Sequence, residues 1–168
     1  TNYYHKAFKY DWWKPVITPA YNDDDGFSLS LGAMYRKMAW HKQPFGWQQS
    51  FTVTGAAATG AVGFAYTGLF KQALGKWDID LIAQYRAPRF ILNFYGYGNE
   101  TTLNSSNKDY YRIRSSGILL NPAVSRSWQR STLRMGPLFQ SVKIEPTANK
   151  FISQPGNGID PSVFKNQH

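Results

Sequence analysis

The sequence predicts an all-β chain: an antiparallel meander of about seven or eight strands in a transmembrane outer-membrane β-barrel, of which it forms a part. Four consecutive segments in residues 27–87 alternate apolar with small or polar residues, so each strand has one apolar and one polar face. Phe, Trp and Tyr make up 17% of the chain, yet the mean hydropathy is −0.46. The aromatic residues gather near the predicted strand ends, as in the girdles of membrane barrels.

The N-terminal segment is predicted to lead into the sheet. Pro15 and Pro19 leave room for only a short strand at Val16–Ala20, because proline interrupts strand pairing. Asn22–Gly26 has the composition of a turn. Its three aspartates are an alternative calcium site, but the spaced ligands of a calcium loop are missing, so a turn is preferred.

Alternation divides the strand residues into two sets. We expect the apolar set to face lipid; it includes Phe27, Leu29, Leu31, Val53, Phe64, Tyr66, Ile79 and Leu81. We expect the polar set to face the lumen; it includes Arg36, Thr52, Thr54, Asp80, Gln84, Arg86, Arg112 and Arg114.

The parity of the apolar residues also predicts the pairing of the strands, since a hairpin must keep apolar faces together. A two-residue turn at Thr59-Gly60 pairs Val53 with Tyr66. The following connection pairs Tyr66 with Leu81, and the first connection, around Gln43, pairs Tyr35 with Phe51.

Three further strands are predicted, at Phe90–Tyr97, Tyr110–Leu120 and Ser131–Ile144. Asn99–Lys108, between the first two, is the longest loop. The dipeptide Gly136-Pro137 should bend the last strand and place it at an edge.

The remaining segments complete the predicted organisation. Asn121-Pro122 breaks or bends a strand, and Val124–Trp128 either continues it or forms a short strand of its own. The chain therefore divides into a lead-in and turn (1–26), barrel strands (27–145) and an irregular tail (146–168), in which Phe151-Ile152 could dock.

Alternation alone leaves a soluble lipid-binding barrel and a β-sandwich as alternatives. Predicted strands of about 11–14 residues suit a tilted membrane crossing better than the usual ~5–6 residues of globular proteins. The polar face carries Ser, Thr, Gln and Arg, whereas the outer face of a soluble barrel usually carries more charge. The membrane barrel is therefore preferred.

The formal charge of +9 suits anionic lipid or lipopolysaccharide phosphate as partners. Nucleic acid is not expected, because no run of Lys and Arg exceeds two residues. The chain has no cysteine, so neither a disulfide framework nor thiol chemistry is predicted. Thr1 begins without a basic and apolar leader, which predicts that a signal peptide is absent or removed.

No enzyme activity and no cofactor are predicted. His5, His41 and His168 are scattered and have no ligand-like neighbours, and no Gly-x-Ser-x-Gly elbow occurs. Asp78 and Asp80 lie about 7 Å apart on one face of an extended strand. They are expected to be lumen-facing partners of Arg36 or Arg86, with a carboxylate pair as the alternative.

Four motifs carry a resemblance to a known family: Tyr21–Phe27, Gln43–Gly46, Gly75–Asp78 and, above all, Asn93–Thr101. Together they resemble the bacterial surface antigen barrels of Bacteroidetes, which are relatives of outer-membrane protein-assembly barrels. The resemblance implies an outer-membrane location and a role as membrane anchor or in protein insertion or translocation. It also implies possible partners: the rest of a larger barrel, or an upstream periplasmic metallophosphoesterase-like domain. The alternatives are a small outer-membrane pore or transporter and a soluble lipid binder.

Two topological expectations follow. Phe164–His168 lacks the terminal aromatic of the family, so we expect an open segment whose first strand and Ser131–Ile144 do not pair. Long loops of such barrels face outward and short turns face the periplasm. Asn99–Lys108 is therefore placed outside, Thr59-Gly60 in the periplasm and Gln43–Gly46 outside.

Overall fold

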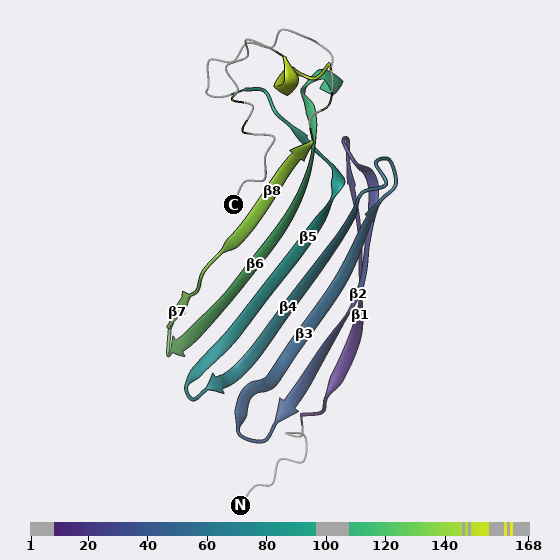
Figure 1. The fold of residues 1–168 in the computed structure, drawn as a ribbon. Coiled ribbons are helices and arrows are strands. Elements are labelled where there is room, and N and C mark those ends of the chain that lie inside the picture. The colour runs from purple at the N-terminus through teal and green to yellow at the C-terminus, as the bar shows by residue number, and fades with distance from the viewer. Residues whose placement is uncertain are drawn as a thin grey trace, which may run out of the picture.

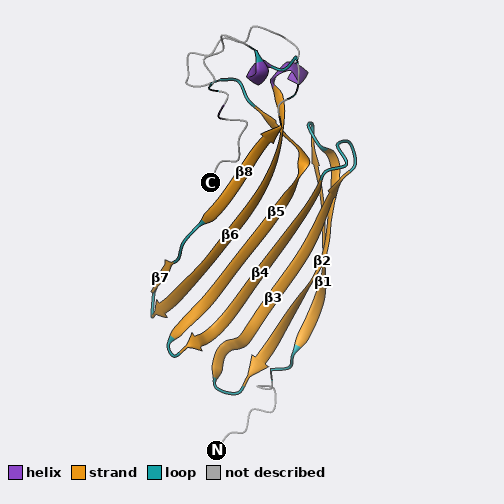
Figure 2. Cartoon of the chain, viewed as in Figure 1, coloured by secondary structure: helices purple, strands orange, loops and turns teal. Residues whose placement is uncertain are grey.

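One antiparallel sheet of eight strands makes up most of the computed structural model (Figure 1), which describes residues 9–96, 108–145, 147, 149–154, 160 and 162. The strands follow one another in chain order from β1 to β7, and β8 also pairs with β6. The predicted all-β antiparallel meander is therefore confirmed. The only helical segments among the described residues are short 3₁₀ turns at one end of the sheet (Figure 2).

The strand bounds show long strands in most of the sheet. They are β1 Trp12–Asn22, β2 Gly26–Ala39, β3 Lys42–Ala56, β4 Val62–Leu74, β5 Trp77–Asn93, β6 Arg112–Trp128, β7 Ser131–Met135 and β8 Phe139–Glu145. Among the described residues, the 3₁₀ turns with assigned bounds are η2 Lys108–Tyr111 and η3 Phe151–Ser153.

Strand β1 is longer than predicted and contains both prolines of that segment. It pairs with β2 along its whole length, from Trp12 opposite Arg36 to Asn22 opposite Gly26. As the edge strand it tolerates proline, because half of its N–H groups have no ladder partner. The sheet therefore begins at Trp12 rather than at Phe27, and the predicted turn at Asn22–Gly26 is the β1–β2 connection.

The predicted parity of the central strands is correct, but each predicted pairing is displaced by two residues. Val53 lies opposite Phe64 rather than Tyr66. Tyr66 lies opposite Ala83, and Tyr35 lies opposite Gln49. Turn length explains the first displacement, because residues 57–61 form the β3–β4 connection that was assigned to two residues. A shift of two residues preserves the faces, whereas a shift of one would exchange them.

Strand β5 joins two segments that were predicted as separate strands. Its register with β6 shifts between Arg86 and Phe90, where the backbone holds a bulge. Pro88 lies within this bulge, a position that tolerates the loss of a backbone donor. The predicted break therefore becomes an irregularity inside one 17-residue strand.

Strand β6 likewise continues through Asn121-Pro122. It pairs with β7 at Val124–Met135 and with β8 at Leu120–Phe139, in one common register. That register sets Pro122 opposite Pro137, so neither residue can donate a backbone hydrogen bond to the other. Strands β7 and β8 are thus one edge strand interrupted at residues 136–138, as Gly136-Pro137 predicted. The Asn121 side chain bridges the gap, donating from Nδ2 to the Pro137 carbonyl oxygen at 2.8 Å.

The continuity of β5 changes the expected sidedness. Thr59-Gly60, between β3 and β4, lies at the same end of the sheet as the β5–β6 connection. The two cannot lie on opposite sides of a membrane, so the predicted assignment is wrong. Gln43–Gly46 is part of β3 rather than a turn. Most of the predicted loop Asn99–Lys108 lies outside the described residues.

The sheet is open within the described residues. Strand β1 pairs only with β2, and the edge formed by β7 and β8 pairs only with β6. The two edges do not form a ladder with each other, in agreement with the expected open arrangement. A closed barrel is therefore not present among these strands.

An aromatic cluster covers the end of the sheet at which β6 begins. The rings of Tyr111 and Phe151 lie 5.5 Å apart, and Ile152 is buried. Lys150 Nζ pairs with the Asp109 carboxylate at 2.7 Å. Its hydrogen bond to that carboxylate lowers the pKa of Asp109. The predicted docking of Phe151-Ile152 is confirmed.

At the same end, the β1–β2 turn is tied to β5 and β6. Arg112 donates to Asp24 Oδ1 from Nη2 at 2.8 Å and from Nε at 3.1 Å, and Asn93 Nδ2 donates to Asp24 Oδ2 at 2.8 Å. The buried Asp25 accepts from the Thr59 hydroxyl at 3.2 Å. These contacts join segments far apart in the strand order, so the sheet must curl to make them.

We expect the Asp24–Arg112 pair to stabilise this curl modestly. Both side chains are about one-quarter exposed, and partly exposed pairs typically contribute about 0.2–1 kcal/mol. Denaturant unfolding of Asp24→Asn, Arg112→Gln and the double variant should give a coupling free energy of about 0.5–1 kcal/mol. Strictly additive effects would show that the pair does not couple the two segments.

Candidate membrane-facing and polar surfaces

The apolar face of the sheet is exposed across its central strands. Cross-strand neighbours Leu31, Val53 and Phe64 belong to it, and the eight residues expected to face lipid all share it. Large side chains lie open on this face: Leu31 is 50% exposed, Phe51 50% and Ile118 57%. Monomeric soluble proteins rarely expose contiguous apolar patches of more than a few hundred Å², and on this sheet the exposed apolar side chains cross several strands.

Aromatic rings on this face contact one another across the strands. The ring centroids of Phe51 and Phe64 lie 6.5 Å apart, and those of Phe64 and Tyr85 lie 6.0 Å apart. Nearer the strand ends, Tyr35 and Trp47 are separated by 5.2 Å. Cross-strand aromatic pairs stabilise a sheet, and this row leaves its outer surface apolar.

The opposite face is lined by small and polar residues. Thr52, Thr54, Gln84, Arg86, Asp80 and Arg36 share it, as predicted. The Ser30 and Thr54 hydroxyl oxygens lie 2.7 Å apart across the β2–β3 ladder. Short side chains suit this face because it is the inner face of the curl, where side chains converge.

Arg36 is held by rings and an amide on this polar face. Its guanidinium carbon lies 4.8 Å from the centre of the Trp12 ring and 4.5 Å from that of Phe45. Its Nε donates to Gln48 Oε1 at 2.8 Å. Stacking between aromatic rings suits the planar guanidinium, so Arg36 is fixed near the mouth of the concave surface.

The two aspartates on β5 pair with neither of the arginines that were predicted. Asp78 pairs with Lys71 at 2.8 Å and accepts from the Gln72 backbone N–H at 2.7 Å. Asp80 pairs with Arg134 at 3.3 Å. Both cations come from neighbouring segments whose register the sequence does not reveal. Each carboxylate thus has a cationic partner of its own.

Arg112 and Arg114 differ from the other residues expected in the lumen. They occupy the same parity of β6 as Ile118 and Leu120, which lie on the apolar face. The buried residues of this part of β6 are Ile113 and Ser115. Alternation was predicted correctly here, but the arginines were assigned to the wrong face. Both lie near the end of the strand, beyond its apolar segment, where a cation can reach water or Asp24.

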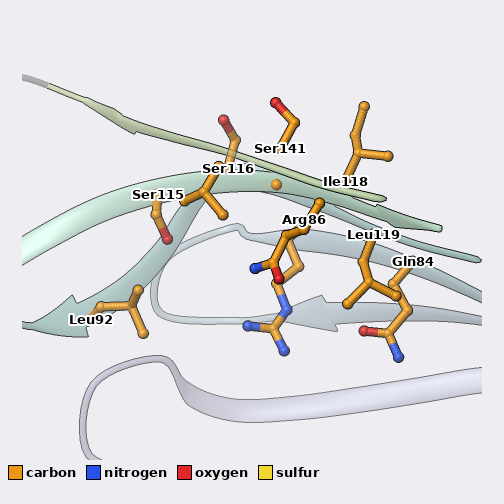
Figure 3. Close-up of a pocket in the computed structure, with 11 residues that line it drawn as sticks. Gln84, Arg86, Leu92, Ser115, Ser116, Ile118, Leu119 and Ser141 are labelled. Atoms are coloured by element: carbon orange, nitrogen blue, oxygen red, sulfur yellow. The ribbon is translucent and has the colours of Figure 1, made fainter. Parts of the chain in front are cut away.

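A shallow depression of about 200 Å³ lies on the sheet where β5, β6 and β8 meet. Figure 3 shows Gln84, Arg86 and Leu119 pointing to one side, toward the interior of the curl, while Ile118 and Ser141 point to the other. Arg86 forms none of the ion pairs found among the described residues. The depression is open to solvent, and its lining combines apolar side chains such as Leu92 and Leu119 with the Arg86 cation.

The described part of the chain holds no group of three His, Cys, Asp or Glu residues that could bind a metal ion. His41 lies in the β2–β3 turn, next to Trp40; His5 and His168 lie outside the described residues. No described helix is long and apolar enough to cross a membrane.

The arrangement therefore consists of two chemically distinct surfaces on one curved sheet. Comparison of the chain with models of protein families, with characterised proteins and with solved structures finds no match.

Proposed function

We propose that this chain forms part of a β-barrel in the bacterial outer membrane, with its apolar face against lipid and its polar face toward a water-filled lumen. In this role it acts as a membrane anchor or in protein insertion or translocation. One observation carries the proposal: large apolar side chains are exposed on the outer face of the curl, while hydroxyls, amides and arginines occupy the inner face. A soluble barrel has the opposite arrangement.

Strand length supports the same proposal. Strand β4 has 13 residues, which at about 3.3 Å per residue extends roughly 43 Å. Tilted by ~45°, such a strand spans about 30 Å, the thickness of the hydrocarbon core. In lipid, unpaired strand edges are prohibitively costly, so the open edges at β1 and β8 would have to pair with further strands.

A pore or transporter is the second candidate. It is favoured by the depression around Arg86, which places on the inner face a cation that has no ion-pair partner among the described residues. Such a cation would favour passage of anions. Single-channel conductance in planar bilayers separates a pore from an anchor: ion-selective current would favour the pore, and its absence the anchor.

Spin labels test the orientation of the two faces. Labels at Leu31, Phe64 and Leu81 should collide with lipid-soluble oxygen and be shielded from a water-soluble nickel complex, because these positions contact acyl chains. Labels at Thr52 and Gln84 should show the reverse. Equal access of both reagents at all five positions would contradict membrane insertion.

A further inference from the structure

The tryptophans of this chain are confined to one end of the sheet. All six lie at the start of β1, in the β2–β3 turn, in the first half of β3, at the start of β5 or at the end of β6, namely Trp12, Trp13, Trp40, Trp47, Trp77 and Trp128. We call this the tryptophan end; it is the lower end in Figure 1. Trp40, in the turn, is 90% exposed. Indole rings favour the headgroup layer of a membrane over either water or hydrocarbon.

Cations accompany the tryptophans. Lys37, Lys76, Arg126 and Arg130 lie at or near the three turns of this end and form none of the ion pairs found among the described residues. Asp11 also lies at this end, where its Oδ1 accepts from the Met38 N–H, but the cations outnumber it, whereas at the opposite end the Asp23–Asp25 turn supplies a partner for Arg112. The tryptophan end therefore combines interfacial rings with uncompensated positive charge, which complements an anionic surface.

Of these four cations, Arg126 lies over two aromatic rings. Its guanidinium carbon lies 5.1 Å from the centre of the Trp128 ring and 5.7 Å from that of Trp77. The two indoles meet edge to face at 6.3 Å. Asp78 pairs with Ser125, so Trp77 and Arg126 are cross-strand neighbours on the apolar face. The rings restrain the guanidinium while its N–H groups, which match the geometry of a phosphate, have no acceptor among the described residues.

We infer that the cluster of Trp77, Arg126 and Trp128 binds the phosphate of an anionic phospholipid whose acyl chains lie along the neighbouring apolar face. The inference rests on the proposed membrane location. The three connections at the tryptophan end are two-residue turns, and short turns face the periplasm in outer-membrane barrels. That side favours a phospholipid over lipopolysaccharide as the occupant.

Spin-labelled lipids test this site in the full chain reconstituted into phosphatidylcholine vesicles. Electron paramagnetic resonance measures the fraction of each lipid that the protein immobilises. Labelled phosphatidylglycerol should be immobilised several-fold more strongly than labelled phosphatidylcholine. Arg126→Gln should reduce this preference about fivefold or abolish it, since a basic side chain near an anionic surface attracts it strongly. In the matched control, Arg114→Gln removes a cation from the same face of the same strand at its other end, and the preference should remain.

Salt and competing anions test the site in the unmodified chain as well. In the unmodified chain, 1 M salt should abolish most of the preference, because the Debye length falls to about 3 Å. A preference unchanged by salt or by Arg126→Gln would overturn the inference. Inorganic phosphate at constant ionic strength should not displace the labelled lipid, and displacement would instead indicate a site for the free anion. Competition by lipopolysaccharide but not by unlabelled phosphatidylglycerol would overturn the phospholipid assignment.

The same measurement separates the two proposals. If neither labelled lipid is immobilised, the chain does not contact a bilayer and the proposed function fails. If both are immobilised to the same extent, the chain lies in the membrane and only the phospholipid site is refuted.

Discussion

Replacing Leu31 by arginine is expected to destabilise the membrane-inserted chain by about 2–4 kcal/mol, which is the cost of a cation on the lipid face near the middle of a barrel strand. Leu31 lies between Ile17 and Val53 on the apolar face and is 50% exposed. In water the same substitution at an exposed site would usually change stability by no more than ~0.5 kcal/mol. Reversible denaturant unfolding in vesicles or micelles measures the difference.

A matched substitution on the polar face provides the control. Gln84→Arg adds the same charge at an exposed position beside Arg86, so its cost should be small if this face meets water. Equal costs for Leu31→Arg and Gln84→Arg would contradict the assignment of the two faces. A negligible cost for both would favour a soluble sheet.

Replacing Gly32 by alanine is expected to cost about 3 kcal/mol, at the upper end of the range for overpacking. A Cβ atom on Gly32 would overlap the Phe51 carbonyl oxygen and lie 2.8 Å from Thr52 Cγ2 and 2.9 Å from Thr52 Cα. Backbone, rather than a movable side chain, fills the space, so β2 and β3 would have to separate. Glycines at such close approaches permit a sheet to curl.

Gly55→Ala is the natural comparison, because Gly55 lies in the neighbouring strand β3 and its added Cβ would have no atom within 4 Å. It should be neutral or stabilising by about 0.5–1 kcal/mol, as alanine restricts the unfolded chain more than glycine does. Hydrogen exchange of the β2–β3 ladder should rise in Gly32→Ala and stay unchanged in Gly55→Ala. Unchanged exchange in both would show that the close approach at Gly32 is not needed for the curl.

The strand alternation was predictable because it depends only on covalent geometry. Successive side chains of a strand point to opposite faces, so Leu29 and Leu31 had to share a face whatever their partners were. The same rule separated Thr52 and Thr54 from Val53. The register was harder to predict, because a displacement of two residues keeps every side chain on the same face of the sheet. The sequence could not distinguish Val53 opposite Tyr66 from Val53 opposite Phe64.

The polar partners were not predictable from the sequence. Asp80 was expected to meet Arg36 or Arg86, both on the same face, but it pairs with Arg134. That contact depends on where β7 lies beside β6, which is set by pairing between distant segments. The tryptophan end was not predicted either. The sequence placed aromatic residues near the strand ends, but it did not show that the tryptophans lie at only one end of the sheet. Knowing that β5 is one strand would have revealed it.

The sequence by itself determined the all-β class, the two faces of each strand and the bend at Gly136-Pro137, because these follow from side-chain alternation and from the missing N–H of proline. Only the tertiary structure decided that β5 and β6 run unbroken past their prolines. Pro88 lies in a bulge, and Pro122 lies opposite Pro137, where the edge strand is interrupted. Whether a proline ends a strand depends on whether the neighbouring strand presents an acceptor at the position where proline lacks an N–H group. That is a property of the neighbouring strand.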